Sequence, residues 1–241
     1  MALNRLDKII CDAGLATRSE ARRFIAAGRV RVEGQAITDP AFKADETLTA
    51  IIVDGQPIKT GFRYLMMYKP EGVLSATEDR NQKTVLALLP KEYGKLGLFP
   101  VGRLDKDTTG LLILTNNGDF CHEVTSPKHH IKKLYEFTAV GPLEYDDIKA
   151  FERGIILQDG TECLPALLEI DENDPTHGYV SVYEGKYHQV KRMLASRGKP
   201  VNTLKRLAVG GLELDAALRP GEFKELSEND IKSVVNKNVT E

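Results

Sequence analysis

Two closely spaced carboxylates in the middle of the chain are the strongest candidates for chemistry. Asp105 and Asp107 lie in the segment VGRLDKDTTG at 101–110, which is followed by the apolar run LLILT. A carboxylate held in a turn before a buried strand can act as a nucleophile when water is excluded around it. The same side chains also fit Asx turns or local capping, and we expect Asp107 to belong to the turn. The spacing alone therefore leaves both interpretations of Asp105 open.

Basic residues are concentrated in three parts of a chain whose net charge is −2. Residues 1–31 carry seven basic and three acidic side chains, a local balance of +4. Residues 185–212 hold seven Lys or Arg and no acid, and residues 124–135 hold three Lys and two His and no acid. Each cluster by itself fits a solvated face, but three together in a slightly acidic protein indicate a surface that binds a polyanion.

Length and composition exclude several classes of protein. The 241 residues suit one large domain or a small domain with a larger one, and the 41% hydrophobic content argues against a mainly disordered chain. No apolar run approaches the length of a transmembrane helix, and the charged N-terminus does not fit an export signal. The three cysteines are far apart, so they predict neither a disulfide framework nor a zinc site. We expect a cytoplasmic protein that does not enter a membrane.

The elements that must position these residues divide the chain into two parts. In the first, residues 1–59, we expect a short amphipathic helix that begins near Leu3. A second helix should follow the capping box of Thr17 and Glu20 and end at Gly28. Short strands are expected over the rest of this part, and Lys59-Thr60-Gly61 is predicted to be a linker.

The second part, residues 60–235, has the pattern of a larger α+β domain. Strands are expected at 64–68, 111–115, 134–140 and 179–183, and helices at 84–89, 148–154, 188–197 and 227–235. Asn116-Asn117-Gly118 fits a turn, and residues 236–241 fit a loose polar tail. Asp105 would then lie in the turn before the buried strand at 111–115.

Four stretches of the sequence together resemble the RsuA branch of the pseudouridine synthases. The segment at 101–110 is similar to the central signature of that family, KKLY at 132–135 to the segment with its motif tyrosine, and EGKYHQVKRM at 184–193 to its third motif. Residues 4–34 resemble an S4 RNA-binding domain. The resemblance covers residues 4–232 in order. It implies an α+β protein: a small S4-like RNA-binding domain at 1–59, then a catalytic domain at 60–235 with a mixed, mainly antiparallel sheet.

The reaction implied by the resemblance is the conversion of a uridine in RNA to pseudouridine, in which the base leaves the ribose and is rejoined through carbon. This isomerisation needs no redox partner, metal or energy source, so we expect no cofactor. The resemblance implies Asp105 as nucleophile, Lys191 as the counter-charge that keeps it ionised in a dry pocket, and Tyr135 as the residue that stacks on the uracil or removes a proton late in the reaction. Many relatives in other branches have Arg in place of Lys191, which would offer a bidentate fork instead of a point charge. Whether Asp105 attacks the ribose, attacks the ring or assists loss of a ribose proton stays open.

RNA contacts are expected in both parts of the chain. The target base must be turned out of folded RNA, and the resemblance implies that Arg103 takes part in this step. The S4-like part should anchor phosphates without reading sequence. The expected RNA-binding residues besides Arg103 are Arg5, Lys8, Arg18, Arg22, Arg23, Arg29, Arg31, Lys128, His129, His130, Lys132, Lys133, His188, Gln189 and Arg192. His129 and His130 have no third ligand nearby, so we expect RNA and not a metal beside them.

The substrate implied by the resemblance is small-subunit (16S) ribosomal RNA, because TSPKHH at 125–130 resembles the small-subunit enzymes of the branch. We expect a monomer that acts on this RNA either free or in a partly assembled small subunit. One alternative is a large-subunit (23S) enzyme of the same branch, which the short tail disfavours. A second is a non-catalytic ribosome assembly factor, which the presence of Asp105, Tyr135 and Lys191 disfavours. A third is a glycosidase for free sugars, which usually needs two carboxylates in set roles and leaves the basic clusters unexplained.

Overall fold

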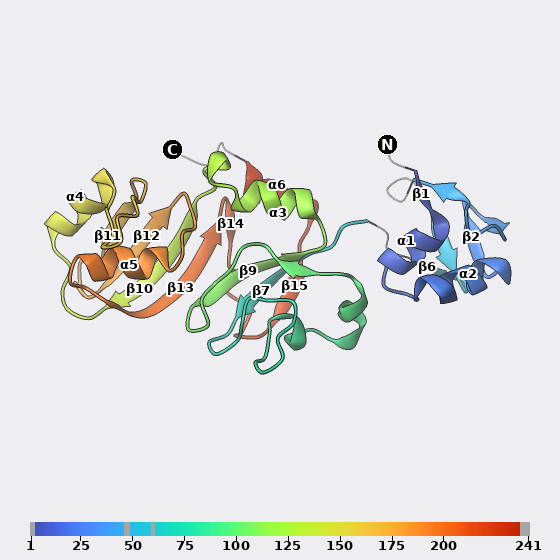
Figure 1. Ribbon diagram of the computed structural model, residues 1–241, viewed down its shortest axis with the longest axis horizontal. Coiled ribbons are helices and arrows are strands. Elements are labelled where there is room, and N and C mark those ends of the chain that lie inside the picture. The colour runs from blue at the N-terminus through green and yellow to red at the C-terminus, as the bar shows by residue number, and fades with distance from the viewer. Residues whose placement is uncertain (1–2, 46–48, 59–60, 237–241) are drawn as a thin grey trace. The chain divides into compact units, whose positions relative to one another are not determined.

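The computed structural model describes residues 3–45, 49–58 and 61–236, and the chain separates into two compact units (Figure 1). The first unit comprises Met1–Arg63 and Leu89–Leu98, and the second comprises Tyr64–Leu88 and Phe99–Glu241. Most of the linker predicted at 59–61 and most of the tail predicted at 236–241 lie outside the described residues. The domain boundary predicted between residues 59 and 60 therefore stays a prediction.

The described residues form helices and mostly short strands in both units. The helices are α1 (Leu6–Asp12), α2 (Arg18–Ala26), α3 (Gly118–Thr125), α4 (Tyr145–Arg153), α5 (Gln189–Ser196) and α6 (Glu228–Val235), with 3-10 helices η1 (Leu86–Leu88), η2 (Lys91–Lys95) and η3 (Pro127–His129). The strands are β1 (Asn4–Arg5), β2 (Val30–Val32), β3 (Gln35–Ile37), β4 (Lys43–Ala44), β5 (Ile51–Val53), β6 (Gln56–Pro57), β7 (Tyr64–Lys69), β8 (Phe99–Pro100), β9 (Thr109–Thr115), β10 (Lys133–Ala139), β11 (Leu167–Ile170), β12 (His177–Val182), β13 (Val201–Val209), β14 (Leu212–Glu213) and β15 (Phe223–Glu225).

In the first unit, α1 and α2 pack with a four-stranded sheet of order β3-β2-β5-β6 around an apolar core. The capping box at the start of α2 is confirmed: the Glu20 N–H donates to Thr17 Oγ1 at 3.3 Å, and the Thr17 N–H donates to Glu20 Oε2 at 2.8 Å. The first helix starts later than predicted, because Asn4 and Arg5 are extended and pair with β4. Leu3 is consequently 60% exposed and is not part of the helix.

The second unit is built on a nine-stranded sheet whose main order is β11-β12-β10-β13-β9-β7-β15. Strand β14 pairs with β13, and β8 pairs with β9. All of these pairs are antiparallel except β13 with β9, which run parallel. The predicted mixed, mainly antiparallel sheet is therefore confirmed.

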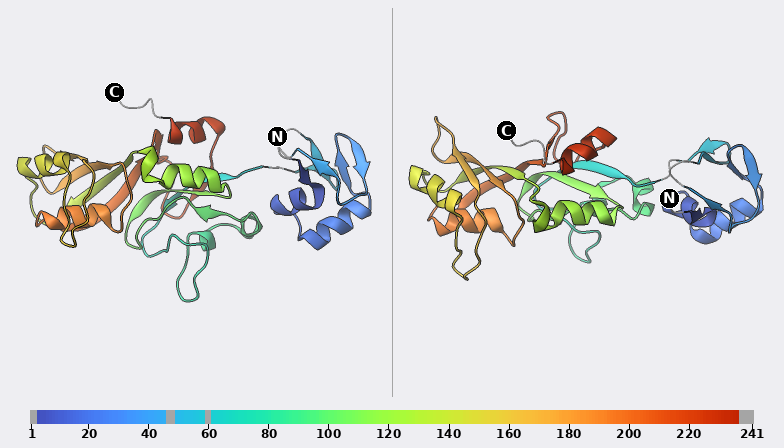
Figure 2. Two further views of the ribbon diagram at one scale, coloured as in Figure 1. Left: turned by 45° about the horizontal axis from the view of Figure 1, so that its top comes forward. Right: turned by 90° about the horizontal axis from the view of Figure 1, so that it is seen from above.

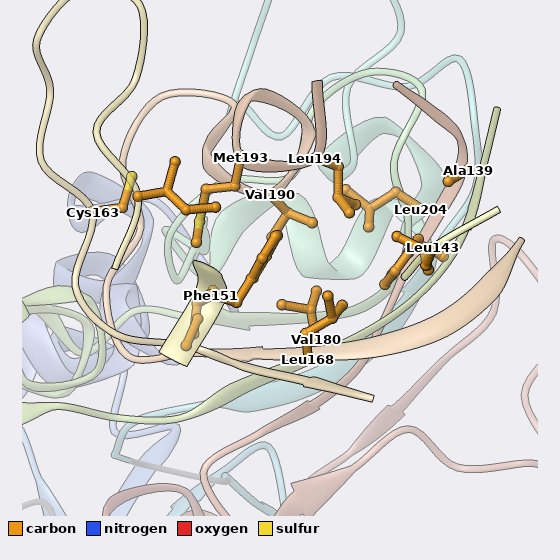
Figure 3. Packing of buried hydrophobic residues seen from close by; sticks show 14 of the residues in the cluster. Ala139, Leu143, Phe151, Cys163, Leu168, Val180, Val190, Met193, Leu194 and Leu204 are labelled. Carbon is orange, nitrogen blue, oxygen red and sulfur yellow. The ribbon is translucent and has the colours of Figure 1, made fainter. Parts of the chain in front are cut away.

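Two apolar cores bind helices to this sheet. In one, Phe151 of α4 and Met193 and Leu194 of α5 pack with Phe137 and Val180 from the sheet, and Figure 3 shows part of this packing. In the other, residues of α3 and α6 pack on β7 and β9. Figure 2 shows these two helices, in green and red, next to each other. The first core fixes α5, whose N-terminal part belongs to the predicted third motif at 184–193.

A single glycine permits the parallel contact of β13 with β9. Gly110 has a φ of +103°, and a Cβ built on it would lie 2.2 Å from the carbonyl oxygen of Arg206. No other residue fits that spacing, so Gly110 lets the two strands approach directly after the loop that holds Asp105.

Several elements of the second unit differ from the sequence prediction: the helix predicted at 84–89 is only the 3-10 helix η1, and the short strands β8, β11, β14 and β15 were not predicted. Asn116-Asn117-Gly118 is more than a turn: Asn117 Oδ1 accepts from the Phe120 N–H at 3.1 Å and caps α3, a helix that the prediction lacked. Strand β13 was also not predicted, because Lys205 and Arg206 interrupt its apolar alternation. Arg206 is nevertheless only 5% exposed, and its Nε donates to the carbonyl of Leu111 at 2.8 Å.

Candidate active site

A pocket in the second unit gathers residues from the 103–108 loop, β10, β12, β13, α5 and the loop that precedes α5. Its lining combines charged groups with an apolar wall. The lining residues are Arg103, Leu104, Asp105, Thr108, Tyr135, Val182, Glu184, Gly185, Lys186, His188, Gln189, Val190, Lys191 and Leu204. The three residues predicted to carry catalysis therefore line one pocket.

The backbone around Asp105 is held on both sides by hydrogen bonds. The Leu104 N–H donates to Ser75 Oγ at 3.1 Å, and Ser75 Oγ donates to the Leu104 carbonyl at 2.9 Å. On the other side, the Thr108 N–H donates to the Asp105 carbonyl at 3.1 Å. A fixed loop keeps the carboxylate in one place without an entropic penalty at each turnover.

The side chain of Lys69 also supports this loop, a role that was not predicted from the sequence. Its side chain is fully buried at the end of β7, and Nζ donates to the carbonyls of Pro70 at 3.0 Å, Lys106 at 3.2 Å and Thr108 at 2.9 Å. Burial lowers the pKa of Lys69 from 10.5 to about 8, although the charges of Asp107 and Asp105 oppose that shift. A lysine that ends the apolar run YLMMY is the signal that could have revealed it.

The carboxylate of Asp105 has a cationic or ionisable partner at each oxygen. Lys191 Nζ lies 3.0 Å from Oδ2, and His188 Nε2 lies 3.2 Å from Oδ1. Asp105 is 26% exposed, so the carboxylate remains accessible from the pocket. The ion pair joins two residues that are far apart in the sequence and belong to different motifs.

Lys191 is shared between two carboxylates. Its ammonium also donates to Asp107 Oδ1, and Asp107 is 65% exposed. Burial disfavours the charge on Lys191, but its hydrogen bonds to Asp107 and Asp105 outweigh burial and raise its pKa above 10.5. The same hydrogen bond from Lys191 lowers the pKa of Asp107. Asp107 is therefore a turn residue that also holds the lysine.

Tyr135 contributes an aromatic side to the pocket. It is half-buried on β10, packs against the core under α4 and α5, and is paired with Val180 of β12 and Arg206 of β13. Val182 and Leu204 line the same pocket. A flat ring and aliphatic side chains can receive a planar base, while the carboxylate and its cations supply the polar wall.

Two of the residues predicted to bind RNA are buried in structural roles. Lys133 is 8% exposed, and its Nζ donates to the Val124 carbonyl at 3.3 Å. Burial, with the charge of Arg206, lowers the pKa of Lys133 to about 8. Gln189 is 5% exposed, and its Nε2 donates to the buried carboxylate of Glu184 at 2.9 Å. Burial of both side chains favours these structural roles, although Gln189 also lines the pocket, and the prediction that the two residues bind RNA stays a prediction.

The other predicted RNA-binding residues of the second unit lie at or near the surface. Arg103, Lys128 and His130 are exposed, whereas His129 and Lys132 are half-buried. Arg192 is partly exposed and forms an ion pair with Asp159. The segment with Lys128 and His129 is the 3-10 helix η3.

Several basic residues of the first unit point to acids of the same unit. Arg5, Arg18 and Arg22 converge on Asp7, whose carboxylate is fully buried, with N–O distances of 3.0, 3.7 and 2.8 Å to Oδ2. Arg29 pairs with Asp54 and lies over the ring of Phe24, Lys8 pairs with Asp12, and Arg31 donates to the Gly34 carbonyl. Arg23 is exposed. About half of each guanidinium side chain around Asp7 stays in contact with solvent.

Two further features of the described residues bear on function. Within the described ranges, no three His, Cys, Asp or Glu side chains gather in a way that could hold a metal ion. None of the helices in the described part of the chain has the length and apolar character needed to cross a membrane.

Two parts of the sequence match known protein families. Residues 63–196 match the family described as RNA pseudouridylate synthase, and residues 4–48 match the S4 domain. The match to the synthase family includes Asp105, Tyr135 and Lys191. The S4 match includes all seven basic residues predicted to bind RNA in the first unit.

Full-length relatives agree with these matches. The chain is 43% identical over 230 residues to the "Uncharacterized RNA pseudouridine synthase YtzG" of Bacillus subtilis, covering 94% of this chain and 96% of that protein. It is 42% identical to the "Ribosomal small subunit pseudouridine synthase A" of Vibrio cholerae and 40% identical to that of Escherichia coli K12, covering 95% and 96% of this chain and 99% and 100% of those proteins. A solved structure described as "Crystal structure of pseudouridylate synthase" is similar with a TM-score of 0.68 and 33% identity, covering 96% of this chain and 99% of that one.

Proposed function

The chain belongs to the RNA pseudouridylate synthase family, and on this premise we propose that it isomerises one uridine of small-subunit ribosomal RNA to pseudouridine with Asp105 as nucleophile. The observation that carries the proposal is the ion pair of Asp105 with Lys191 in a pocket that Tyr135 also lines. It supplies an ionised carboxylate, a fixed counter-charge and an aromatic surface in one place.

In the proposed reaction, the bond between the ribose carbon and the uracil nitrogen breaks, and a bond from the same ribose carbon to a ring carbon forms. Asp105 makes this exchange possible by adding to the ribose or the ring, or by assisting loss of a ribose proton. Lys191 keeps the carboxylate charged while the pocket excludes water. The hydrogen on the newly bonded ring carbon must then leave, and Tyr135 is suited to stack on the base or to accept that proton. The ring nitrogen that was joined to the ribose gains a proton, and Asp105 is released as a carboxylate, so no atom is gained or lost overall.

The small-subunit substrate rests on the relatives and not on the pocket. Two proteins named as small-subunit enzymes are 40% and 42% identical over nearly the whole chain. We propose that the S4-like unit anchors the RNA through exposed basic residues such as Arg23, and that Arg103 at the pocket helps to turn the base out. Such a substrate would place a monomer of this protein in the cytoplasm, on free RNA or on an assembling subunit.

The experiment that tests this function is to map pseudouridines in ribosomal RNA from cells that lack the gene. We expect one site in small-subunit RNA to lose its modification, and the parent gene but not the Asp105→Asn variant to restore it. A loss confined to large-subunit RNA would move the substrate to the other subunit. Unchanged modification of all ribosomal RNA would overturn the proposal.

A further inference from the structure

The rim of the pocket carries an exposed aromatic ring that the proposed chemistry does not use. Tyr187 is 75% exposed, and its ring lies almost parallel to the imidazole of His188, with centroids 3.8 Å apart and an interplanar angle of 18°. His188 Nε2 in turn lies 3.2 Å from Asp105 Oδ1. A path of direct contacts therefore leads from an exposed ring to the carboxylate proposed to react.

The backbone at His188 is strained in a way that helix stability does not explain. His188 has a φ of +48° and a ψ of +36°, the left-handed region that side-chain-bearing residues rarely adopt. It occupies the N-cap of α5, yet its side chain makes no capping hydrogen bond. Asn or Gly would suit this conformation better, and Ser or Asp would cap better. Strain of this kind is typical of functional positions, where the surrounding structure holds the residue in place.

Buried hydrogen bonds hold the loop that presents the two rings. The Glu184 carboxylate is 4% exposed and accepts from the Leu164 N–H and from Gln189 Nε2, each at 2.9 Å. Gln189 Oε1 accepts from the Lys186 N–H at 3.0 Å. On the outer side, Arg192 donates to the Tyr187 carbonyl at 3.4 Å and pairs with Asp159. The ring of Tyr187 is thus presented by a rigid frame, which reduces the entropy lost when a ligand binds.

The chemistry of this rim suits a nucleobase. One face of Tyr187 lies against His188, and the high exposure of the residue leaves the other face open to solvent. Bases of unpaired RNA stack on such rings regardless of their identity. Arg103 and Lys186 line the same pocket; Lys186 pairs with Glu184, and the exposed Arg103 provides positive charge for the phosphates of the strand. An exposed tyrosine between Lys186 and His188, which both line the pocket, is placed to meet the nucleotide beside the one inside.

We propose that Tyr187 is a stacking subsite for the nucleobase adjacent to the target uridine, and that His188 links this subsite to Asp105 as a positioning residue. The inference rests on the proposed function and adds a substrate requirement to it: the neighbour of the target must be unpaired and must carry a base. When the neighbouring base stacks on Tyr187, the stack holds His188 in place, and His188 holds one oxygen of Asp105. RNA that lacks that base loses both the contact and the alignment.

The test uses the full-length protein and RNA oligonucleotides that span the mapped uridine, with an ordinary or an abasic nucleotide at each adjacent position. Both Kd and kcat/KM are measured for the parent, Tyr187→Phe and Tyr187→Ala. We expect Tyr187→Ala to weaken binding of ordinary RNA roughly 10- to 100-fold and Tyr187→Phe to bind like the parent. Removing one neighbouring base should weaken parent binding by a similar factor and have no further effect on Tyr187→Ala. Tyr145→Ala, which removes another exposed tyrosine of the same unit, should change neither quantity.

A second variant tests the link through His188. Asn at position 188 tolerates the left-handed backbone and can cap α5, so His188→Asn should melt at the same or a higher temperature than the parent. We expect it to lower kcat, whereas Tyr187→Ala should mainly raise KM. If His188→Asn leaves kcat unchanged, the link to Asp105 is wrong.

Other outcomes separate the subsite from the proposed function. If Tyr187→Ala binds RNA like the parent, the stacking subsite is wrong. It is also wrong if the abasic nucleotide weakens binding to Tyr187→Ala by the same factor as binding to the parent. An effect seen only with assembling subunits and not with free RNA would assign Tyr187 to a protein contact and would also overturn it. If the parent binds these RNAs but forms pseudouridine neither in them nor in assembling small subunits, the proposed function fails, and the stacking result is still read in Kd.

Discussion

Asp7 in the first unit and Asp105 in the second are both carboxylates among basic residues. They differ in how many cations surround them and in how far they are buried. Asp7 is fully buried and faces three guanidinium groups, from Arg5, Arg18 and Arg22. The hydrogen bond from Arg5 holds the pKa of Asp7 well below its usual range, and it does so despite burial. Asp105 is partly exposed, and its one permanent cation, Lys191, is shared with Asp107.

The difference separates a structural carboxylate from one that can react. Guanidinium groups contact both oxygens of Asp7, whose side chain is fully buried, so its charge serves to hold the start of α1 against α2. Asp105 has Lys191 and His188 beside it and is 26% exposed, which leaves its carboxylate available to a substrate. Both sites use an aspartate among basic residues, so residue type does not distinguish them. The number of cations around each carboxylate and its exposure to solvent do.

Among changes to the groups that surround the two carboxylates, removing the shared cation should have the largest effect. Lys191→Met keeps the side-chain length and leaves Asp105 and Asp107 facing each other without a counter-charge. We expect turnover to fall roughly 10²- to 10³-fold, as for loss of one charge-stabilising group in an active site. The remaining rate should rise with pH further than that of the parent, because a desolvated carboxylate without a partner favours its protonated form. Single-turnover rates between pH 5.5 and 9 check this, and a profile that overlays the parent's would contradict it.

Removing the carboxylate of Asp7 in the first unit should lower stability and leave turnover unchanged. Asp7→Asn leaves three guanidinium groups around a neutral amide, and we expect the first unit to lose roughly 2 to 3 kcal/mol, less than a fully buried pair because the arginines are half exposed. The folded pKa of Asp7 lies below its unfolded value of about 4, so its stabilisation is present above that pH and is lost as pH falls further. Calorimetric melting from pH 7 to pH 2.5 should therefore show the gap between parent and variant closing in acid. If the difference in melting temperature between parent and variant stays constant with pH, the ion pairs of Asp7 do not stabilise the first unit.

A buried cation without any carboxylate partner extends the comparison. Lys69→Met removes three hydrogen bonds to carbonyls, and we expect a loss of about 1 to 2 kcal/mol at pH 7. Because the folded pKa of Lys69 is about 8 and its ordinary value is 10.5, the unfolded chain binds more protons between these values. The parent should therefore gain stability relative to the variant as pH rises from about 8 to 10.5. Urea unfolding of both proteins at pH 7 and pH 10 measures this, with the exposed Lys83→Met as control.

The smallest effect is expected at a histidine between two acids. His177 Nδ1 lies 3.1 Å from Asp171 and Nε2 lies 3.2 Å from Glu136. Burial disfavours its charge, but these hydrogen bonds outweigh burial and raise its pKa above 6.5. Its stabilisation is therefore complete below about pH 6.5 and is lost as pH rises through the folded pKa. We expect His177→Gln to lose on the order of 0.5 kcal/mol at pH 5.5 and less at pH 8.5, measured by thermal unfolding.

The parts of the fold that the sequence predicted correctly are those determined by neighbours in the chain. The capping box predicted at Thr17 with Glu20 is confirmed, and so is the helix predicted at 227–235, which starts with a capping box of Ser227 and Asp230; each box needs only residues three apart. The start of α3 was missed although Asn117 is a good N-cap, since the prediction stopped at the turn. Strand β13 was missed because its pattern reflects burial of Arg206 against another strand, which no local window contains.

The candidate site was likewise predicted only in part. Its motifs identified Asp105, Tyr135 and Lys191 through a family resemblance, and the structure brings them to one pocket. The contacts that hold the site in place were not predicted, because they join residues that are far apart in the sequence. Lys69 bonds to Thr108, and Glu184 bonds to Leu164, only once the sheet and loops are assembled.

The most direct test of the account compares two carboxylates that share one lysine. Pseudouridine formation in a single turnover is measured for Asp105→Asn and Asp107→Asn on the same RNA, with equal binding of RNA verified in parallel. We predict no product above background for Asp105→Asn, and product for Asp107→Asn at a rate within roughly 10-fold of the parent, because Lys191 keeps its pair with Asp105. Product from Asp105→Asn, with deamidation back to Asp excluded by mass spectrometry, would contradict the assignment of Asp105 as the nucleophile.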